Sequence, residues 1–253
     1  MSRLALAFKP DRPALVAYMM AGEPDLQRDV EYALAVLAEA DVLEIGVPFS
    51  DPVADGPTIE RAHTRALARG ASLTHAFDLA KTLRAQSSKP LVLMTYYNPV
   101  LQRGLDKFAR ECREAGVDGV ILPDCPLEES GPAAAALAAE RIDLIQLASP
   151  ATPPERLARL AKATRGFLYV ISSYGTTGAR DELPPEALDV VARARAACGM
   201  TPFAVGFGIS LPAHVRQLHA AGAPGVVVGS AIVGRIEKGD SAAQASAFVR
   251  SLR

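Results

Sequence analysis

Net charge, paired cysteines and long apolar runs are scarce in this 253-residue sequence, and each scarcity excludes a class of protein. The 27 basic and 28 acidic residues leave a formal charge of −1, so no basic surface for nucleic acid or an anionic membrane is expected. The cysteines Cys112, Cys125 and Cys198 form no Cys-x-x-Cys pair, which argues against a disulfide framework and a zinc site and favours a reducing compartment.

Targeting and metal-binding signals are missing as well. No apolar run reaches the roughly 18 residues that a membrane helix needs. Residues 1–24 lack the apolar core and cleavage site of a signal peptide, so a cytoplasmic protein without a membrane partner is expected. The histidines His63, His75, His214 and His219 show no metal-ligand spacing, and we expect them at the surface with no metal bound.

The sequence does contain a regular alternation of short apolar runs and longer amphipathic segments. The short runs are rich in β-branched or aromatic residues and are bounded by Gly, Pro, Ser or Asp, which is typical of buried parallel strands. They cover residues 15–20, 42–47, 91–96, 119–123, 143–148, 167–172, 203–208 and 225–230.

The amphipathic segments predict helices, because apolar residues recur on one face at helical spacing. They cover residues 25–40, 58–69, 73–86, 103–115, 128–141, 154–164, 184–198, 212–221 and 240–252. Eight strands alternating with helices predict an α/β fold: a (β/α)8 TIM barrel with extra short helices, a single domain over residues 1–253. An open doubly wound sheet is the alternative, but AGEPD follows the first strand where that fold usually has G-x-G-x-x-G.

Glu44 is unusual because it stands in the middle of an apolar strand. Side chains alternate along a strand, so Leu43, Ile45 and Val47 share one face and Glu44 falls on the other. The bulky face should meet the helices, which directs Glu44 into the barrel, where burial raises a carboxyl pKa. Barrel enzymes react at the carboxyl ends of their strands, so Glu44 is a candidate general acid/base, with an interior ion pair as the alternative.

The loop that follows, PFSDPVADGPTIE, is longer than usual, and long loops are often functional. Its two aspartates also suit plain turns, because Asp51 precedes a proline and Asp55 precedes a glycine. The spacing favours a turn for Asp51 and leaves Asp55 open between a turn and a catalytic group.

Glycines end the last two strands and predict a phosphate site. Gly206, Gly208 and Gly229 would let backbone N–H groups approach a ligand. Ser230 could cap a short helix over residues 231–237, and barrels often bind phosphate at such a helix N-terminus. Plain turns are the alternative.

The loop after the sixth strand, SSYGTTGARDELPP, is also long. Gly175 and Gly178 could serve as hinges of a lid, and a disordered surface loop is the alternative. The tyrosines Tyr18, Tyr96 and Tyr169 lie on or just after predicted strands and suit either the core or a pocket wall.

These segments resemble the tryptophan synthase alpha chain family. LEIGVPFSDPVADGPTI at residues 43–59 is the most specific likeness, and MTYYNP, PDCPLEES, GTTGAR, GFGIS and VVGSAIV follow in order through nearly the whole chain. The resemblance implies a lyase of tryptophan biosynthesis that cleaves indole-3-glycerol phosphate to indole and glyceraldehyde 3-phosphate. It also implies no cofactor in this chain and an α2β2 heterotetramer with a pyridoxal-phosphate-dependent β chain.

The resemblance gives roles to individual residues. Glu44 takes the position of the glutamate that moves protons between a glycerol hydroxyl and indole C3, and Asp55 that of the aspartate that binds the indole N–H. The phosphate would rest on the backbone of Gly178, Gly206, Phe207, Gly208 and Gly229 and on the Ser230 hydroxyl. Tyr18, Tyr96, Tyr169 and Phe207 would line the indole pocket, and Thr177 would contact Asp55 when the lid closes.

Three other functions compete with this one. An isomerase or epimerase with a phosphate-binding barrel would usually have a metal-binding His set or another acid/base pair. A non-catalytic barrel that activates a β chain would not need an intact Glu44 and Asp55. A stand-alone indole-releasing lyase is barely distinguished from the α2β2 enzyme by the sequence. The stretch Ser173–Thr176 and the residue Met20 depart from the family pattern and bear on lid kinetics and β-chain communication.

Overall fold

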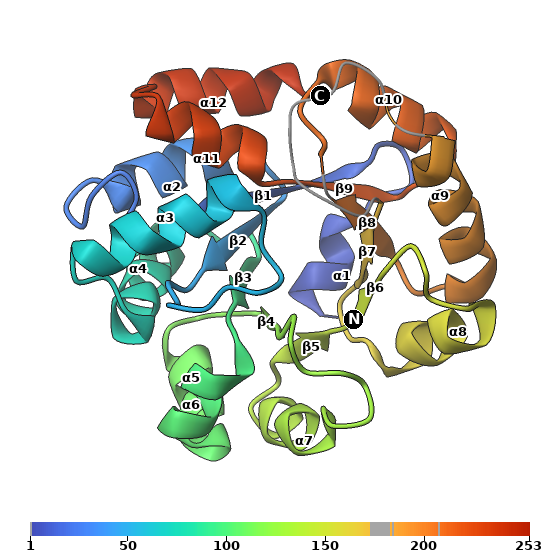
Figure 1. The fold of residues 1–253 in the computed structure, drawn as a ribbon, viewed down its shortest axis with the longest axis horizontal. Coiled ribbons are helices and arrows are strands. Elements are labelled where there is room, and N and C mark those ends of the chain that lie inside the picture. Colours follow the sequence, from blue (N-terminus) through green and yellow to red (C-terminus); the bar gives the residue numbers. More distant parts are fainter. Residues whose placement is uncertain (1, 173–182, 184, 207) are drawn as a thin grey trace.

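Parallel strands surrounded by helices form a nearly closed barrel in the computed structural model, which describes residues 2–172, 183, 185–206 and 208–253 (Figure 1). The strands within those residues are β1 (Ala14–Met20), β2 (Val42–Gly46), β3 (Leu91–Met94), β4 (Gly119–Ile121), β5 (Asp143–Ile145), β6 (Leu147–Ala148), β7 (Leu168–Ile171), β8 (Phe203–Gly206) and β9 (Gly225–Val228). They pair in the order β5-β4-β3-β2-β1-β9-β8-β7-β6. The predicted (β/α)8 fold is confirmed.

The extra strand arises from one interruption. The predicted fifth strand is divided at Gln146, whose N–H donates to the Thr164 hydroxyl at 2.9 Å instead of to a neighbouring strand. Since β5 pairs with β4 and β6 pairs with β7, the two pieces together complete the circle of eight predicted strands.

The helices lie outside the strands, apart from α1, which lies within their ring (Figure 1). They are α1 (Arg3–Ala7), α2 (Asp29–Glu39), α3 (Pro57–Ala68), α4 (Leu73–Gln86), α5 (Tyr97–Arg103), α6 (Leu105–Glu114), α7 (Gly131–Ala139), α8 (Pro154–Ala163), α9 (Pro185–Cys198), α10 (Pro212–Ala220), α11 (Ser230–Glu237) and α12 (Ala242–Ser251). The two helices predicted after the second strand are α3 and α4.

Helices α1 and α5 were not predicted. The third strand was expected to reach Tyr96, but β3 ends at Met94 and α5 begins at Tyr97. Pro99 explains the difference, because a residue without an N–H suits the first turn of a helix and not a strand. The Asp124 carboxylate also accepts the Tyr97 N–H at 2.8 Å.

Strand alternation divides the core into two parts. Leu43, Ile45 and Val47 pack in the large cluster between strands and helices, as predicted, whereas Val42 belongs to the cluster inside the barrel. Leu4 of α1 joins that inner cluster. A Cβ added at Gly119, the first residue of β4, would clash with Leu4, so α1 covers the amino-terminal ends of the strands. The carboxyl ends of the strands are not covered by α1 and are where a ligand can bind.

The covering helix gives a test of this packing. Leu4 has no exposed surface, so Leu4→Ala is expected to lower the free energy of unfolding by about 2–5 kcal/mol. Leu6 on the same helix is 61% exposed, and Leu6→Ala should change it by less than about 0.5 kcal/mol. Urea unfolding followed by circular dichroism measures both, and equal effects would contradict the packing.

Candidate active site

Glu44 lies at the centre of β2, between Tyr18 of β1 and Val92 of β3, and only 1% of it is exposed. Its Oε2 atom has no hydrogen-bond partner among the described residues, and no ion pair to it is formed within them. The interior ion pair that competed with a catalytic role is therefore not found in this part of the chain. Burial, followed by the charge of Asp55, raises the pKa of Glu44 to about 8.

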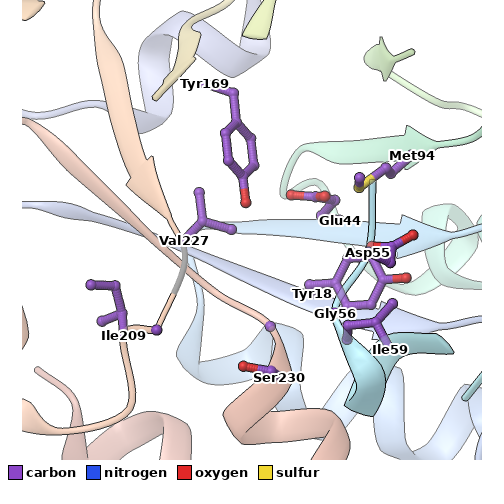
Figure 2. A pocket seen from close by; sticks show the side chains of 12 residues that line it. Tyr18, Glu44, Asp55, Gly56, Ile59, Met94, Tyr169, Ile209, Val227 and Ser230 are labelled. Carbon is purple, nitrogen blue, oxygen red and sulfur yellow. The ribbon is translucent and has the colours of Figure 1, made fainter. Parts of the chain in front are cut away.

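A cavity opens beside Glu44 at the carboxyl ends of the strands (Figure 2). Its walls come from strands on both sides of the barrel, from the loop before α3 and from the start of α11. The lining residues are Tyr18, Glu44, Asp55, Gly56, Ile59, Met94, Tyr169, Gly208, Ile209, Val227, Gly229 and Ser230. Most of this surface is apolar, and the two carboxyl groups lie together on one side.

Asp55 reaches the cavity from the loop between β2 and α3. Its Oδ2 atom accepts a hydrogen bond from the Tyr96 hydroxyl at 2.7 Å and lies 3.1 Å from Nε2 of His63. Asp51, in the same loop, is exposed and accepts a hydrogen bond from its neighbour Ser50. The turn favoured for Asp51 and the site role left open for Asp55 agree with these positions, because of the two only Asp55 lines the cavity.

The expectation that the histidines lie at the surface is wrong for His63 and His214, which are 2% and 1% exposed. His63 was missed as a site residue, although its position on α3 gave a signal. Ile59, Ala62 and Ala66 are buried on the same face, so His63 continues a helical apolar stripe that begins next to Asp55. A polar residue in such a stripe requires a polar partner.

Two glycines make room for two tyrosines of the cavity wall. A Cβ added at Gly46 would overlap the Tyr18 hydroxyl, and one at Gly206 would overlap the Tyr169 hydroxyl. Burial, together with the charges of Asp55 and Glu44, raises the pKa of both phenols well above the usual value, so they remain neutral.

The structure brings most of the named site residues together, but some of them line the cavity and others pack behind its wall. Tyr18 and Tyr169 line the cavity, whereas Tyr96 lies behind Asp55 and is not among the lining residues. Gly206 packs against Tyr169 instead of facing the cavity. Gly178, Phe207 and Thr177, together with the predicted hinge Gly175, lie outside the described residues.

The far end of the cavity suits an anion. Gly208, Gly229 and Ser230 line it, and Ser230 is the first residue of α11, whose N-terminus therefore faces the cavity. The sequence suggested Ser230 as the helix cap, but Gly229 holds that position and no side chain caps the helix. Gly208 has φ of +79°, a conformation that favours glycine.

The described residues contain neither a metal-binding cluster nor a membrane-spanning helix. Three or more His, Cys, Asp or Glu side chains arranged to hold a metal ion do not occur among them. None of the helices in the same part of the chain has the length and apolar character needed to cross a membrane.

Comparison with known proteins decides the family. The sequence model of the tryptophan synthase alpha chain family matches residues 4–252 of this chain. The chain belongs to this family. A tryptophan synthase alpha chain from Thermococcus kodakarensis is 45% identical over 91% of this chain and 92% of its own length, and one from Picosynechococcus is 44% identical over 95% and 92%.

Solved structures agree with the family. A chain from the tryptophan synthase α2β2 complex of Pyrococcus furiosus has a TM-score of 0.89 and 44% identity, covering 94% of this chain and 97% of that one. A chain from Aquifex aeolicus has a TM-score of 0.91 and 36% identity, covering 100% and 98%. The family's alpha chains are lyases that cleave indole-3-glycerol phosphate, and in the complex pyridoxal phosphate belongs to the β chain.

The raised pKa of Glu44 predicts how the stability of the protein depends on pH. Between pH 4.5 and about 8 an unfolded chain loses this proton while the folded chain keeps it, so the contribution of Glu44 to folding falls as pH rises. Glu44→Gln cannot ionise, so its stability lacks this dependence on pH. The free energy of unfolding of Glu44→Gln minus that of the native protein should therefore increase by about 3–5 kcal/mol between pH 4.5 and pH 8.5. Urea unfolding at several pH values measures this.

The matched control is Glu60→Gln, which changes an exposed glutamate on α3. Its stability should follow that of the native protein across the same pH range. If the Glu44→Gln curve also runs parallel to the native curve, Glu44 titrates normally and the desolvation argument fails.

Proposed function

We propose that this chain cleaves indole-3-glycerol phosphate by a retro-aldol reaction in which Glu44 transfers the protons and Asp55 binds the indole ring. One observation carries the proposal: a buried carboxyl group with a pKa of about 8 faces a cavity beside a second carboxylate. A group with a pKa near the working pH can act first as an acid and then as a base, and carbon–carbon cleavage here requires both.

The reaction begins with Glu44 protonated, which is its main form at neutral pH. It donates this proton to indole C3, and the ring nitrogen acquires positive charge. The Asp55 carboxylate accepts a hydrogen bond from the ring N–H and stabilises that charge. Glu44, now a carboxylate, takes the proton of the hydroxyl on the carbon attached to C3. The carbon–carbon bond breaks, its electrons restore the indole ring, and the aldehyde forms.

The phosphate group would bind at the opposite end of the cavity. The N-terminus of α11, Gly208, Gly229 and the Ser230 hydroxyl support this assignment. Tyr18 and Tyr169 would enclose the indole ring. The roles of Gly178, Phe207 and Thr177 rest on the family resemblance, and so does a phosphate contact of Gly206.

A β chain is the proposed partner. The relative from Pyrococcus furiosus is part of an α2β2 complex, and we extend that assembly to this chain. Pyridoxal phosphate would be bound by the β chain, and the α reaction would use only the side chains named above. We also propose that residues 1–253 form one domain and that the protein is cytoplasmic.

The central test compares cleavage by the native chain with cleavage by Glu44→Gln. The purified chain should release glyceraldehyde 3-phosphate from indole-3-glycerol phosphate, measured with and without a β chain. Glu44→Gln should abolish this activity, because the amide cannot transfer the proton, while substrate affinity measured by calorimetry stays within about threefold. An equal loss of binding would mean that Glu44 is structural, and a folded but inactive native protein would refute the function.

Ser230 tests the phosphate end separately. Ser230→Ala removes one hydrogen bond to a charged group that is present before and during the reaction. KM should therefore rise about tenfold with kcat nearly unchanged. A fall in kcat at constant KM would contradict phosphate binding at this helix.

A further inference from the structure

His63 joins the two ends of the loop that carries Asp55. Its Nδ1 atom accepts a hydrogen bond from the Phe49 N–H at 3.0 Å, just after β2, and its Nε2 atom lies 3.1 Å from Oδ2 of Asp55, just before α3. The ring is 2% exposed, so solvent does not replace either contact. A single buried side chain thus spans the loop.

The backbone determines which ring nitrogen of His63 carries the hydrogen. The Phe49 N–H is a donor only, so Nδ1 must be the acceptor and a hydrogen on Nδ1 would face another hydrogen. The hydrogen of the neutral ring is then on Nε2, where it points at the Asp55 carboxylate. This tautomer follows from the geometry around both nitrogens.

Tyr96 is held in the same manner. The Ala54 N–H, from the same loop, donates to the Tyr96 hydroxyl oxygen at 3.0 Å, and the hydroxyl in turn donates to Oδ2 of Asp55 at 2.7 Å. The ring of Tyr96 stacks on Phe49 with centroids 5.0 Å apart and meets His63 edge-on at 6.3 Å. Two fixed donors therefore converge on one oxygen of Asp55.

We infer that His63 is a positioning residue: its Nε2–H holds Oδ2 of Asp55 and so presents the other oxygen, Oδ1, to the N–H of the substrate's ring. The inference rests on the proposed function and deepens it. A carboxylate on a loop can rotate, whereas one whose Oδ2 is held by two donors presents Oδ1 in one direction. The hydrogen bond between Oδ1 and the ring N–H strengthens as positive charge develops on the ring. It therefore stabilises the transition state more than the bound substrate, and its orientation should affect mainly kcat.

Two amide substitutions separate the contacts of His63. In His63→Asn the amide atoms occupy the place of Nδ1, so the Phe49 contact can form but the donor to Asp55 is lost. In His63→Gln an amide N–H2 reaches the place of Nε2 and can donate to Asp55. We expect kcat for indole-3-glycerol phosphate to fall about tenfold in His63→Asn and to stay within about threefold of the native value in His63→Gln, with KM little changed in both.

The control is His219→Asn, the same substitution at an exposed histidine of α10, which should leave kcat and KM unchanged. The inference is overturned if His63→Asn has native kcat, or if His63→Gln is impaired as much as His63→Asn. The latter result would assign the effect to the packing of the imidazole ring, which both variants lose, because His63→Asn keeps the Phe49 contact. Inactivity of the native chain would instead refute the proposed function.

A second measurement does not depend on activity or on folding of the variants. In the native chain with 15N-labelled histidine, two-bond correlations distinguish the ring nitrogens. We expect Nε2 of His63 to carry the hydrogen and Nδ1 to accept the Phe49 N–H. A hydrogen on Nδ1 with none on Nε2 would remove the donor to Asp55 and overturn the inference.

Discussion

Desolvation of Glu44 is the constraint on which the rest of the site depends. A carboxyl group at the centre of a nearly closed barrel loses its water, and no cation among the described residues compensates for the loss. The proton is therefore retained to about pH 8. A matching cation would lower the pKa and remove the acid. Proton transfer by Glu44 thus depends on the absence of a cationic partner for its carboxyl group among the described residues.

The surrounding residues keep this carboxyl isolated and accessible on one side. Tyr18 and Tyr169 can lie across the cavity because Gly46 and Gly206 have no side chains. Helix α1 packs at the amino-terminal ends of the strands, and the cavity lies at their carboxyl ends. Each feature is a packing arrangement in the barrel, and together they produce a largely apolar cavity at the carboxyl ends of the strands.

Asp55 is controlled in the opposite way. Where Glu44 lacks partners, Asp55 has two donors on one oxygen, and each donor is oriented by a backbone N–H of the loop that carries Asp55. Hydrogen bonds to a carboxylate favour its charged form and fix its direction. The two carboxyl groups thus occupy one cavity but differ in environment, which suits an acid/base beside a stationary anion.

The sequence by itself determined the order of strands and helices, the inward direction of Glu44 and the glycine turns before α11. These follow from local rules: side chains alternate along a strand, apolar residues repeat along a helix, and glycine permits close approach. Only the tertiary structure decided the remainder. The residues around Asp55 left it open between a turn and a catalytic group, and its role is decided only because α3 and the segment after β3 bring His63 and Tyr96 to it. The break at Gln146 depends on Thr164, eighteen residues away. Contacts between distant segments leave no local pattern, so the partners of a carboxylate appear only when the chain is folded.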